Sequence, residues 1–168
     1  MAEIIPGSTA ASPAATLADE PDPSREKSSS SGIYAHLYEG KKVLIVDDSP
    51  TVTVFTKSAL LRGGYQVETA NNIWISSQVS TFHPDMILMD VHLGASLGTA
   101  AVAALRNRTF TKEIRLVLYS TLELDELERL AHECGADGVI TKKSDPEYLL
   151  RQVRRCFIEA ALKAELGR

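Results

Sequence analysis

Between Lys41 and the end of the chain, short apolar runs alternate with stretches whose apolar residues recur at helical spacing. Such alternation is typical of repeated strand–helix units around a parallel sheet. The first, third and fourth runs are almost continuously apolar, as expected for parallel strands that are covered on both faces. The five predicted strands are residues 42–47, 66–70, 85–90, 114–120 and 138–141.

Helices are predicted between these strands from the spacing of the apolar residues. For the second helix we expect a cap at Asn71 or Asn72, with Ile75 on the apolar face and Trp74 partly buried beside it. In the fourth helix, Leu124 begins a stripe of apolar residues at core spacing.

The last helix is predicted to start at Asp145 and Pro146, a capping residue followed by a residue suited to the first turn. Its pattern continues to about Leu166. We therefore expect residues 159–168 to extend this helix beyond the sheet.

The N-terminal 40 residues differ in composition from the rest of the chain. Within residues 1–32, Ala, Ser and Pro occupy 17 positions and large apolar side chains are few, so little surface can be buried on folding. We predict a disordered extension over residues 1–40 and a globular domain over residues 41–158. The stretch from Ile33 to Gly40 contains two tyrosines. It can dock on the domain or on a partner, or pack loosely beside the first strand.

The net charge of −4 resides in this N-terminal part of the 168-residue chain. Residues 1–40 carry two basic and six acidic side chains, whereas residues 41–168 carry 16 of each. A domain with balanced charge lacks the basic surface with which nucleic-acid-binding proteins neutralise phosphates. We therefore expect no nucleic acid among the partners.

The two cysteines, Cys134 and Cys156, form no metal-binding motif, and we expect reduced thiols with a packing role. The sequence contains no apolar run of the roughly 18–20 residues that span a bilayer, and its N-terminus lacks the plan of a secretory signal. These features predict a cytoplasmic protein without a membrane partner.

Polar and charged side chains stand at the ends of four predicted strands. Asp47 and Asp48 end the first strand, Asp90 the third and Ser120 the fourth, and Lys142 follows the fifth. Ligands of open α/β sheets gather at the carboxyl ends of the strands, so we expect these five side chains to meet at one edge. Three carboxylates outnumber one ammonium, and their mutual repulsion favours the binding of a further cation.

Mg²⁺ is the expected cation, because it prefers oxygen ligands and is usually held by one or two carboxylates together with phosphate oxygens. A carboxylate beside Mg²⁺ can attack a phosphoryl group and form an aspartyl phosphate. An ammonium and a hydroxyl then neutralise and orient the phosphoryl oxygens. Asp90, Lys142 and Ser120 have the chemistry for these three roles.

At these positions the sequence resembles the receiver domains of bacterial two-component response regulators. The shared motifs are VDD, MILMD, LVLYS and GADGVITK, whose Asp47, Asp90, Ser120 and Lys142 are separated by 43, 30 and 22 residues. HPD before the third strand and Gly98, eight residues after Asp90, match as well. The resemblance covers about residues 41–158. It implies an α/β fold of the doubly wound (βα)5 flavodoxin-like kind, with a five-stranded parallel sheet in the order 2-1-3-4-5.

The same resemblance implies a role for each acidic residue. Asp90 would be the phosphoacceptor and a Mg²⁺ ligand, Asp48 a second direct ligand, and Asp47 a ligand through water. The backbone carbonyl of His92 would complete the ligands that the protein supplies.

By the same resemblance, Ser120 and Lys142 would bind the phosphoryl oxygens, and movement of Ser120 would report the modification. The donor would be a histidine kinase or a phosphotransfer protein. The target protein would bind the face built from the fourth helix, the fifth strand and the fifth helix. The chain would catalyse only its own phosphorylation and dephosphorylation and would not otherwise be an enzyme.

Some positions depart from the common pattern of these receivers. Leu93 and Gly94 replace the usual Met-Pro after Asp90, which is expected to loosen that loop. Val139 stands three residues before Lys142, where an aromatic residue often swings inward on activation. The coupling from the site to the output face can therefore differ from the usual one.

The leading interpretation is a single-domain response regulator, because too few residues follow the last predicted core position for an output domain. The alternative is an interaction module of the same fold that works without phosphorylation. A phosphatase similar to the haloacid-dehalogenase-like enzymes is disfavoured, since Ser49 stands where those enzymes have a second Asp. A P-loop is also absent, because GASLGT lacks the required Lys.

Overall fold

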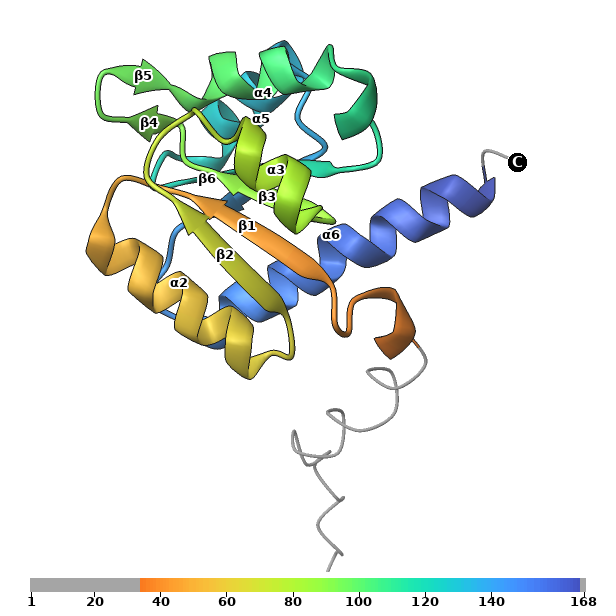
Figure 1. Ribbon diagram of the computed structural model, residues 1–168. Coiled ribbons are helices and arrows are strands. Elements are labelled where there is room, and N and C mark those ends of the chain that lie inside the picture. Colours follow the sequence, from red (N-terminus) through yellow and green to blue (C-terminus); the bar gives the residue numbers. More distant parts are fainter. Residues whose placement is uncertain (1–33, 167–168) are drawn as a thin grey trace, which may run out of the picture. The chain divides into compact units, whose positions relative to one another are not determined.

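The structure, a computed structural model, describes residues 34–166. Figure 1 shows five strands in one sheet with helices on both of its faces. The strands are β1 (Lys42–Val46), β2 (Gln66–Ala70), β3 (Met86–Met89), β6 (Arg115–Ser120) and β7 (Gly138–Thr141). The α-helices are α2 (Pro50–Arg62), α3 (Ser76–Phe82), α4 (Gly98–Arg106), α5 (Leu124–Cys134) and α6 (Pro146–Leu166). The remaining elements are the hairpin of β4 (His92–Leu93) and β5 (Ser96–Leu97) and the 3-10 turns η1 (Ala35–Leu37) and η2 (Thr109–Thr111).

The main sheet is wholly parallel, and its strand order is β2-β1-β3-β6-β7. Within residues 34–166, β4 and β5 form a separate two-stranded sheet, so β6 and β7 are the fourth and fifth strands of the main sheet. The order therefore corresponds to 2-1-3-4-5 and confirms the predicted doubly wound α/β fold. The predicted strand bounds agree with the observed ones to within one residue at each end. The central position of β3 places its carboxyl end between those of β1 and β6.

Two apolar layers cover the sheet. α2 and α6 lie on one face, and α3, α4 and α5 lie on the other (Figure 1). Within β1, Val43 and Ile45 pack toward the first layer, whereas Leu44 and Val46 pack toward the second. Alternation along the strand sends successive side chains to opposite faces. An unbroken apolar run is therefore needed where both faces are covered.

The helix ends are fixed by local signals in the sequence. Ser49 caps α2, and its side chain accepts a hydrogen bond from the Val52 amide at 3.5 Å, with Pro50 in the first turn. Gly135 ends α5 in the left-handed conformation at a φ of 75°. The predicted start of α6 is confirmed, because Asp145 accepts a hydrogen bond from the Glu147 amide at 2.9 Å.

In the described residues, the last helix extends beyond the sheet. α6 continues to Leu166, and its C-terminal turns project past the sheet (Figure 1). Leu162 and Leu166 on these turns are 42% and 87% exposed. The last buried residue of the helix is Ala160.

Three local predictions are wrong. α3 begins at Ser76 without a side-chain cap, because Asn72 instead accepts a hydrogen bond from the Trp74 amide at 2.9 Å. Trp74 is 81% exposed, since Ile75 is buried and Ile73 partly buried on the opposite side of this short segment. Leu124 is also exposed, because it lies in the first turn of α5, beyond the edge of the packed core.

The segment before β1 packs on the domain. Tyr38 is only 5% exposed and belongs to the core on the α2 and α6 side. The guanidinium carbon of Arg154 in α6 lies 5.4 Å from the centre of the Tyr38 ring. The folded part therefore includes residues that we assigned to the disordered extension. The rest of that extension, residues 1–33, lies outside the described residues, as do residues 167–168 of the C-terminal one.

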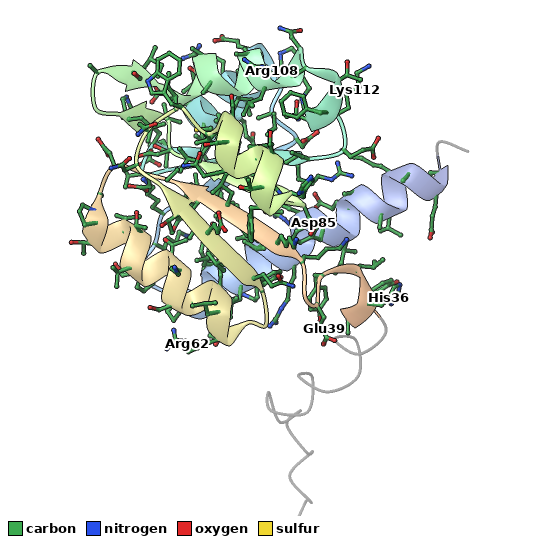
Figure 2. All side chains as sticks on the ribbon, in the orientation of Figure 1. His36, Glu39, Arg62, Asp85, Arg108 and Lys112 are labelled. Atoms are coloured by element: carbon green, nitrogen blue, oxygen red, sulfur yellow. The ribbon has the colours of Figure 1, made fainter. Side chains whose placement is uncertain are left out.

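At the amino ends of the strands, acidic side chains accept hydrogen bonds from the backbone of neighbouring strands. Asp85, labelled in Figure 2 near the start of β1, accepts a hydrogen bond from the Lys42 amide at 2.8 Å and pairs with the Lys41 ammonium at 3.1 Å. Asp137 similarly accepts a hydrogen bond from the Leu116 amide at 2.8 Å. These carboxylates lie at the opposite end of the strands from Asp90 and have a structural role.

Both cysteines are free thiols, and their surroundings agree with the predicted packing role. Cys134 is buried, and Cys156 packs against the core on the α2 and α6 side. Burial raises the pKa of the Cys156 thiol to about 11. Separately, we find that no helix in residues 34–166 combines the length and apolar character needed to cross a membrane.

Candidate functional site

The predicted site residues lie at the carboxyl ends of the central strands. Asp47 follows β1 and Asp90 follows β3, and these strands pair with Val46 opposite Met89. This register brings the two aspartates side by side. Asp48 joins them, because one carboxylate oxygen from each of the three residues lies within 4.8 Å of the others.

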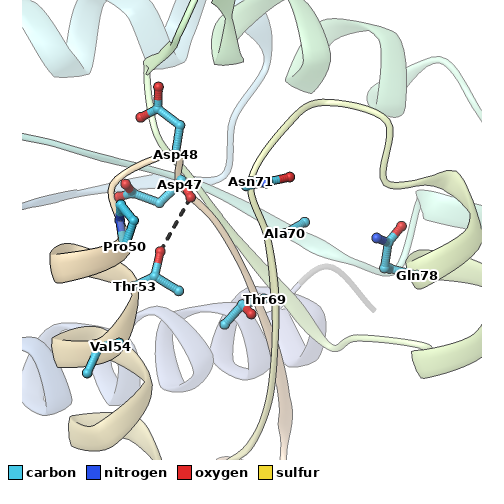
Figure 3. Close-up of a pocket in the computed structure, with 9 residues that line it drawn as sticks. All are labelled: Asp47, Asp48, Pro50, Thr53, Val54, Thr69, Ala70, Asn71 and Gln78. Atoms are coloured by element: carbon cyan, nitrogen blue, oxygen red, sulfur yellow. Dashed lines mark hydrogen bonds between the residues drawn. The ribbon is translucent and has the colours of Figure 1, made fainter.

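Burial and hydrogen bonds distinguish the three carboxylates. Asp47 is 2% exposed and Asp90 8% exposed, whereas Asp48 is open to solvent. One oxygen of Asp47 accepts a hydrogen bond from the Ser49 amide at 2.9 Å. Thr53 in α2 donates to the Asp47 backbone carbonyl at 3.3 Å (Figure 3). The cap residue of α2 thus holds the Asp47 carboxylate, and the helix itself holds the Asp47 backbone.

Lys142 supplies the positive charge of this cluster. Its ammonium nitrogen lies 2.7 Å from Asp47 Oδ2 and 2.9 Å from Asp90 Oδ2, and its side chain is 11% exposed. Burial of these carboxylates would be unfavourable without a partner. The ammonium offsets part of their repulsion, yet within the described part of the chain three carboxylates share one close cation. An oxygen-rich group with excess negative charge fits the preferences of a divalent cation such as Mg²⁺.

Ser120 ends β6 beside this group and is 1% exposed. Its hydroxyl oxygen accepts a hydrogen bond from the Leu122 amide at 3.5 Å, and its carbonyl accepts one from the Lys142 amide at 2.7 Å. The backbones that carry the hydroxyl and the ammonium are therefore directly linked. Val139, earlier in β7, is partly buried against the core on the α3, α4 and α5 side.

The loop after Asp90 folds as a short hairpin. His92 pairs with Leu97 and has an exposed side chain, while Gly94 in the turn has a φ of 57°. This left-handed conformation explains why glycine replaces the usual residue there. A Cβ atom on Gly94 would lie 3.6 Å from Asp48 Oδ2, so the turn closely approaches the most exposed carboxylate.

Gly98 begins α4 in contact with the backbone of Asp90. A Cβ atom at this position would overlap the Asp90 carbonyl oxygen and would lie 2.9 Å from Met89 Cγ. The Gly98 amide donates a hydrogen bond to the Val91 carbonyl at 2.9 Å. The close approach of α4 to Asp90 therefore requires glycine. This requirement explains why glycine stands eight residues after Asp90.

A pocket of about 490 Å³ opens beside Asp47 and Asp48 (Figure 3). Its walls come from the first turns of α2, the end of β2 and the start of α3. Apart from the two aspartates, the lining is neutral: Pro50, Thr53, Val54, Thr69, Ala70, Asn71 and Gln78. The acidic group is thus accessible from solvent on this side.

One neighbour of the site was missed by sequence reasoning. Tyr119, the residue before Ser120, is 2% exposed and lies with its ring centre 5.4 Å from the Lys142 ammonium. Its hydroxyl shares a hydrogen bond of 3.2 Å with Thr56 Oγ1 in α2. Burial raises the pKa of the Tyr119 phenol, and the Thr56 bond and the Lys142 charge oppose that rise. The apolar run around it gives no signal for such a contact.

The comparison with protein families agrees with this geometry. The family model of the response regulator receiver domain matches residues 43–154. Among curated proteins, the chain is 30% identical over 125 residues to the alkaline phosphatase synthesis transcriptional regulatory protein PhoP of Bacillus subtilis, covering 74% of this chain and 51% of that protein. It is 28% identical over 116 residues to the phosphate regulon transcriptional regulatory protein PhoB of Pseudomonas aeruginosa, covering 68% and 51%. The chain spans about half the length of these curated relatives.

Solved structures give the same result. The chain is 29% identical to the chemotaxis response regulator CheY4 of Vibrio cholerae, with a TM-score of 0.64, covering 69% of this chain and 98% of that one. It is 31% identical to the signal receiver domain of a signal transduction histidine kinase from Syntrophus aciditrophicus, with a TM-score of 0.61, covering 71% and 91%. The chain therefore belongs to the family of response regulator receiver domains found in two-component signalling.

Proposed function

We propose that this receiver domain is a phosphoacceptor in a phosphorelay, in which Asp90 accepts a phosphoryl group and the modification changes contacts with another protein. The observation that supports this most strongly is the position of Lys142, within 3 Å of both Asp47 and Asp90 in a group of three carboxylates. Membership of the receiver family makes a histidine kinase or a phosphotransfer protein the expected donor.

The proposed reaction is a phosphoryl transfer to a carboxylate. An oxygen of Asp90 attacks the phosphorus atom, the bond from phosphorus to the donor's leaving atom breaks, and the electron pair of that bond stays with the donor. The ammonium of Lys142, already 2.9 Å from Asp90, stays close to the negative oxygens of the transferred group. The hydroxyl of Ser120, at the neighbouring strand end, can donate to one of them.

The three aspartates fit Mg²⁺ in number, in ligand type and in their excess negative charge. Asp48 and Asp90 would hold the ion directly and Asp47 through water, with the carbonyl of His92 as a further ligand. When bound, Mg²⁺ would neutralise the negative charge that gathers on the phosphoryl oxygens. Asp48, the most exposed of the three, is the residue that an entering ion would meet first.

We propose that the signal leaves through the face formed by α5, β7 and α6. A pocket of about 320 Å³ lies beside Lys142 at the ends of these elements, and its lining includes Thr121, Leu124 and Tyr148. Movement of Lys142 or of the β6–α5 loop would change the shape of this pocket. Since Val139 occupies the place of the usual aromatic residue, such a change would pass through the loop rather than through an aromatic side chain.

Several further expectations remain proposals. These are the cytoplasmic location and a partner set without nucleic acid or membrane. The alternative of a module that works without phosphorylation would be preferred if Asp90 proved inert.

The experiment that tests the proposal is phosphoryl uptake from a small acyl phosphate, followed by intact mass. We expect a gain of one phosphoryl group with Mg²⁺, none after chelation, and none in Asp90→Asn. Asp125→Asn is the matched control, because Asp125 is an exposed acid on α5 away from the cluster. A gain that persists in Asp90→Asn would contradict the proposal. No gain together with no Mg²⁺ binding would favour the phosphorylation-independent module.

A further inference from the structure

The side chain of Lys142 has three close neighbours of two kinds. Two are the carboxylates of Asp47 and Asp90, at 2.7 and 2.9 Å from its ammonium nitrogen. The third is the ring of Tyr119, whose centre is 5.4 Å from the same atom. A cation over the face of an aromatic ring within about 6 Å is attracted by the negative charge of that face, most strongly when water is excluded. With its side chain 11% exposed, Lys142 meets this condition.

The Tyr119 ring is itself held in place. Its backbone lies in β6, which is paired on both sides, and its hydroxyl shares a hydrogen bond with Thr56 in α2. Thr56 and Tyr119 are 0% and 2% exposed. The ring is therefore fixed at its base by the sheet and at its hydroxyl by a helix, and it has little room to move.

We propose that Tyr119 is a positioning residue that keeps the Lys142 ammonium between Asp47 and Asp90 while charge changes around it. The carboxylates are unsuited to hold the ammonium alone, because binding of a cation and transfer of a phosphoryl group both change their charge. The ring face keeps the same attraction throughout. This inference deepens the proposed function, on which its effect on phosphoryl transfer rests.

Two substitutions separate the ring from the hydroxyl. Tyr119→Leu removes the aromatic face, and Tyr119→Phe keeps the face while losing the bond to Thr56. Tyr65→Leu is the matched control, because Tyr65 is a tyrosine buried to a similar degree, 3% exposed, in the same apolar layer. It has no described contact with Lys142. If Tyr119→Leu acted only by destabilising the fold, Tyr65→Leu would change the two readouts below by the same amount.

The first readout is the proton nuclear Overhauser effect between the Lys142 ε-methylene and the β-methylenes of Asp47 and Asp90, which reports the position of the ammonium and does not depend on phosphorylation. We expect this effect in the wild type, in Tyr119→Phe and in Tyr65→Leu, and its weakening in Tyr119→Leu. Equal effects in all four proteins would overturn the positioning role, even if the domain proved unable to accept a phosphoryl group.

The second readout is the rate of phosphoryl uptake from a small acyl phosphate, measured over a range of donor and Mg²⁺ concentrations. We expect Tyr119→Leu to lower the maximal rate about tenfold with little change in Mg²⁺ affinity, and Tyr119→Phe to keep at least half of the rate. A rate in Tyr119→Leu equal to that of Tyr65→Leu would overturn the inference, as would a Tyr119→Phe protein as slow as Tyr119→Leu. A wild type that takes up no phosphoryl group contradicts the proposed function instead, and the NMR comparison then decides the positioning role.

Discussion

The ammonium of Lys142 lies 2.9 Å from Asp90 and 2.7 Å from Asp47. Lys142 directly follows β7, and its side chain therefore links the carboxyl ends of β1 and β3. The like charges of the two carboxylates repel each other, and burial strengthens this repulsion because little water screens it. We therefore expect the stability of the fold to depend on the same contact that the proposed reaction uses.

Replacement of Lys142 tests this dependence. We expect Lys142→Met to lower the free energy of unfolding by about 3 kcal/mol, because it leaves the two buried carboxylates without their ammonium. Urea unfolding at neutral pH measures the change, and millimolar Mg²⁺ should recover part of it. Lys143→Met is the control, since Lys143 is exposed and its ammonium lies over the Tyr148 ring instead. Equal stability of the two variants would show that the bridge contributes nothing.

Gly98 tests the close contact between α4 and Asp90. Gly98→Ala would force its new methyl group into the Asp90 carbonyl, so we expect a loss of about 2 to 3 kcal/mol and a displaced acceptor with slower phosphoryl uptake. Gly138→Ala offers a comparison, because its Cβ would only reach Cys156 Sγ at 3.6 Å. If Gly98→Ala were as stable and as active as Gly138→Ala, the contact would not be needed.

The segment before β1 contributes to the fold through Tyr38. Tyr38→Ala removes a buried ring from the core layer that contains α6, and we expect it to cost about 3 kcal/mol of stability. Tyr34→Ala, in the same segment but 39% exposed, should change the free energy of unfolding by less than about 0.5 kcal/mol. Thermal or urea unfolding of the full chain compares the two. Similar values for both would mean that this segment does not dock.

His92 provides a test of how long the modified state lasts. Its exposed imidazole stands two residues after Asp90 and can orient a water molecule toward the phosphoryl group. We expect His92→Ala to slow dephosphorylation by roughly threefold to tenfold, less than a full general base would contribute. The decay of the phosphorylated protein after donor removal gives the rate, with the exposed His132→Ala as control. An unchanged decay would refute this role.

The positions of the acids and of Lys142 were predictable because they depend on topology. Once the apolar runs indicate parallel strands, any residue directly after a strand must lie at the carboxyl edge, whatever the details of packing. Asp47, Asp90 and Lys142 meet there as expected. The same reasoning places Ser120 at this edge, at the end of β6.

Features that depend on contacts between distant segments were not predictable. In the sequence, Tyr119 is one residue of an apolar strand. Its hydroxyl contacts Thr56 because α2 packs on the sheet, and its ring contacts the side chain of Lys142. Tyr38 similarly docks against α6, more than 100 residues away in sequence. Trp74 is exposed because its neighbour Ile75 is buried. In a short extended segment, adjacent side chains point to opposite sides, so both cannot enter the core.

If Asp90 accepts the phosphoryl group, the modification can be located on that residue. After reaction with an acyl phosphate and Mg²⁺, borohydride reduction converts a phosphorylated aspartate into homoserine, which peptide mass spectrometry assigns to one position. We expect homoserine at position 90 and unmodified Asp47 and Asp48. Homoserine at either of those two positions, or a phosphoryl group retained on Ser120, would show that Asp90 is not the acceptor.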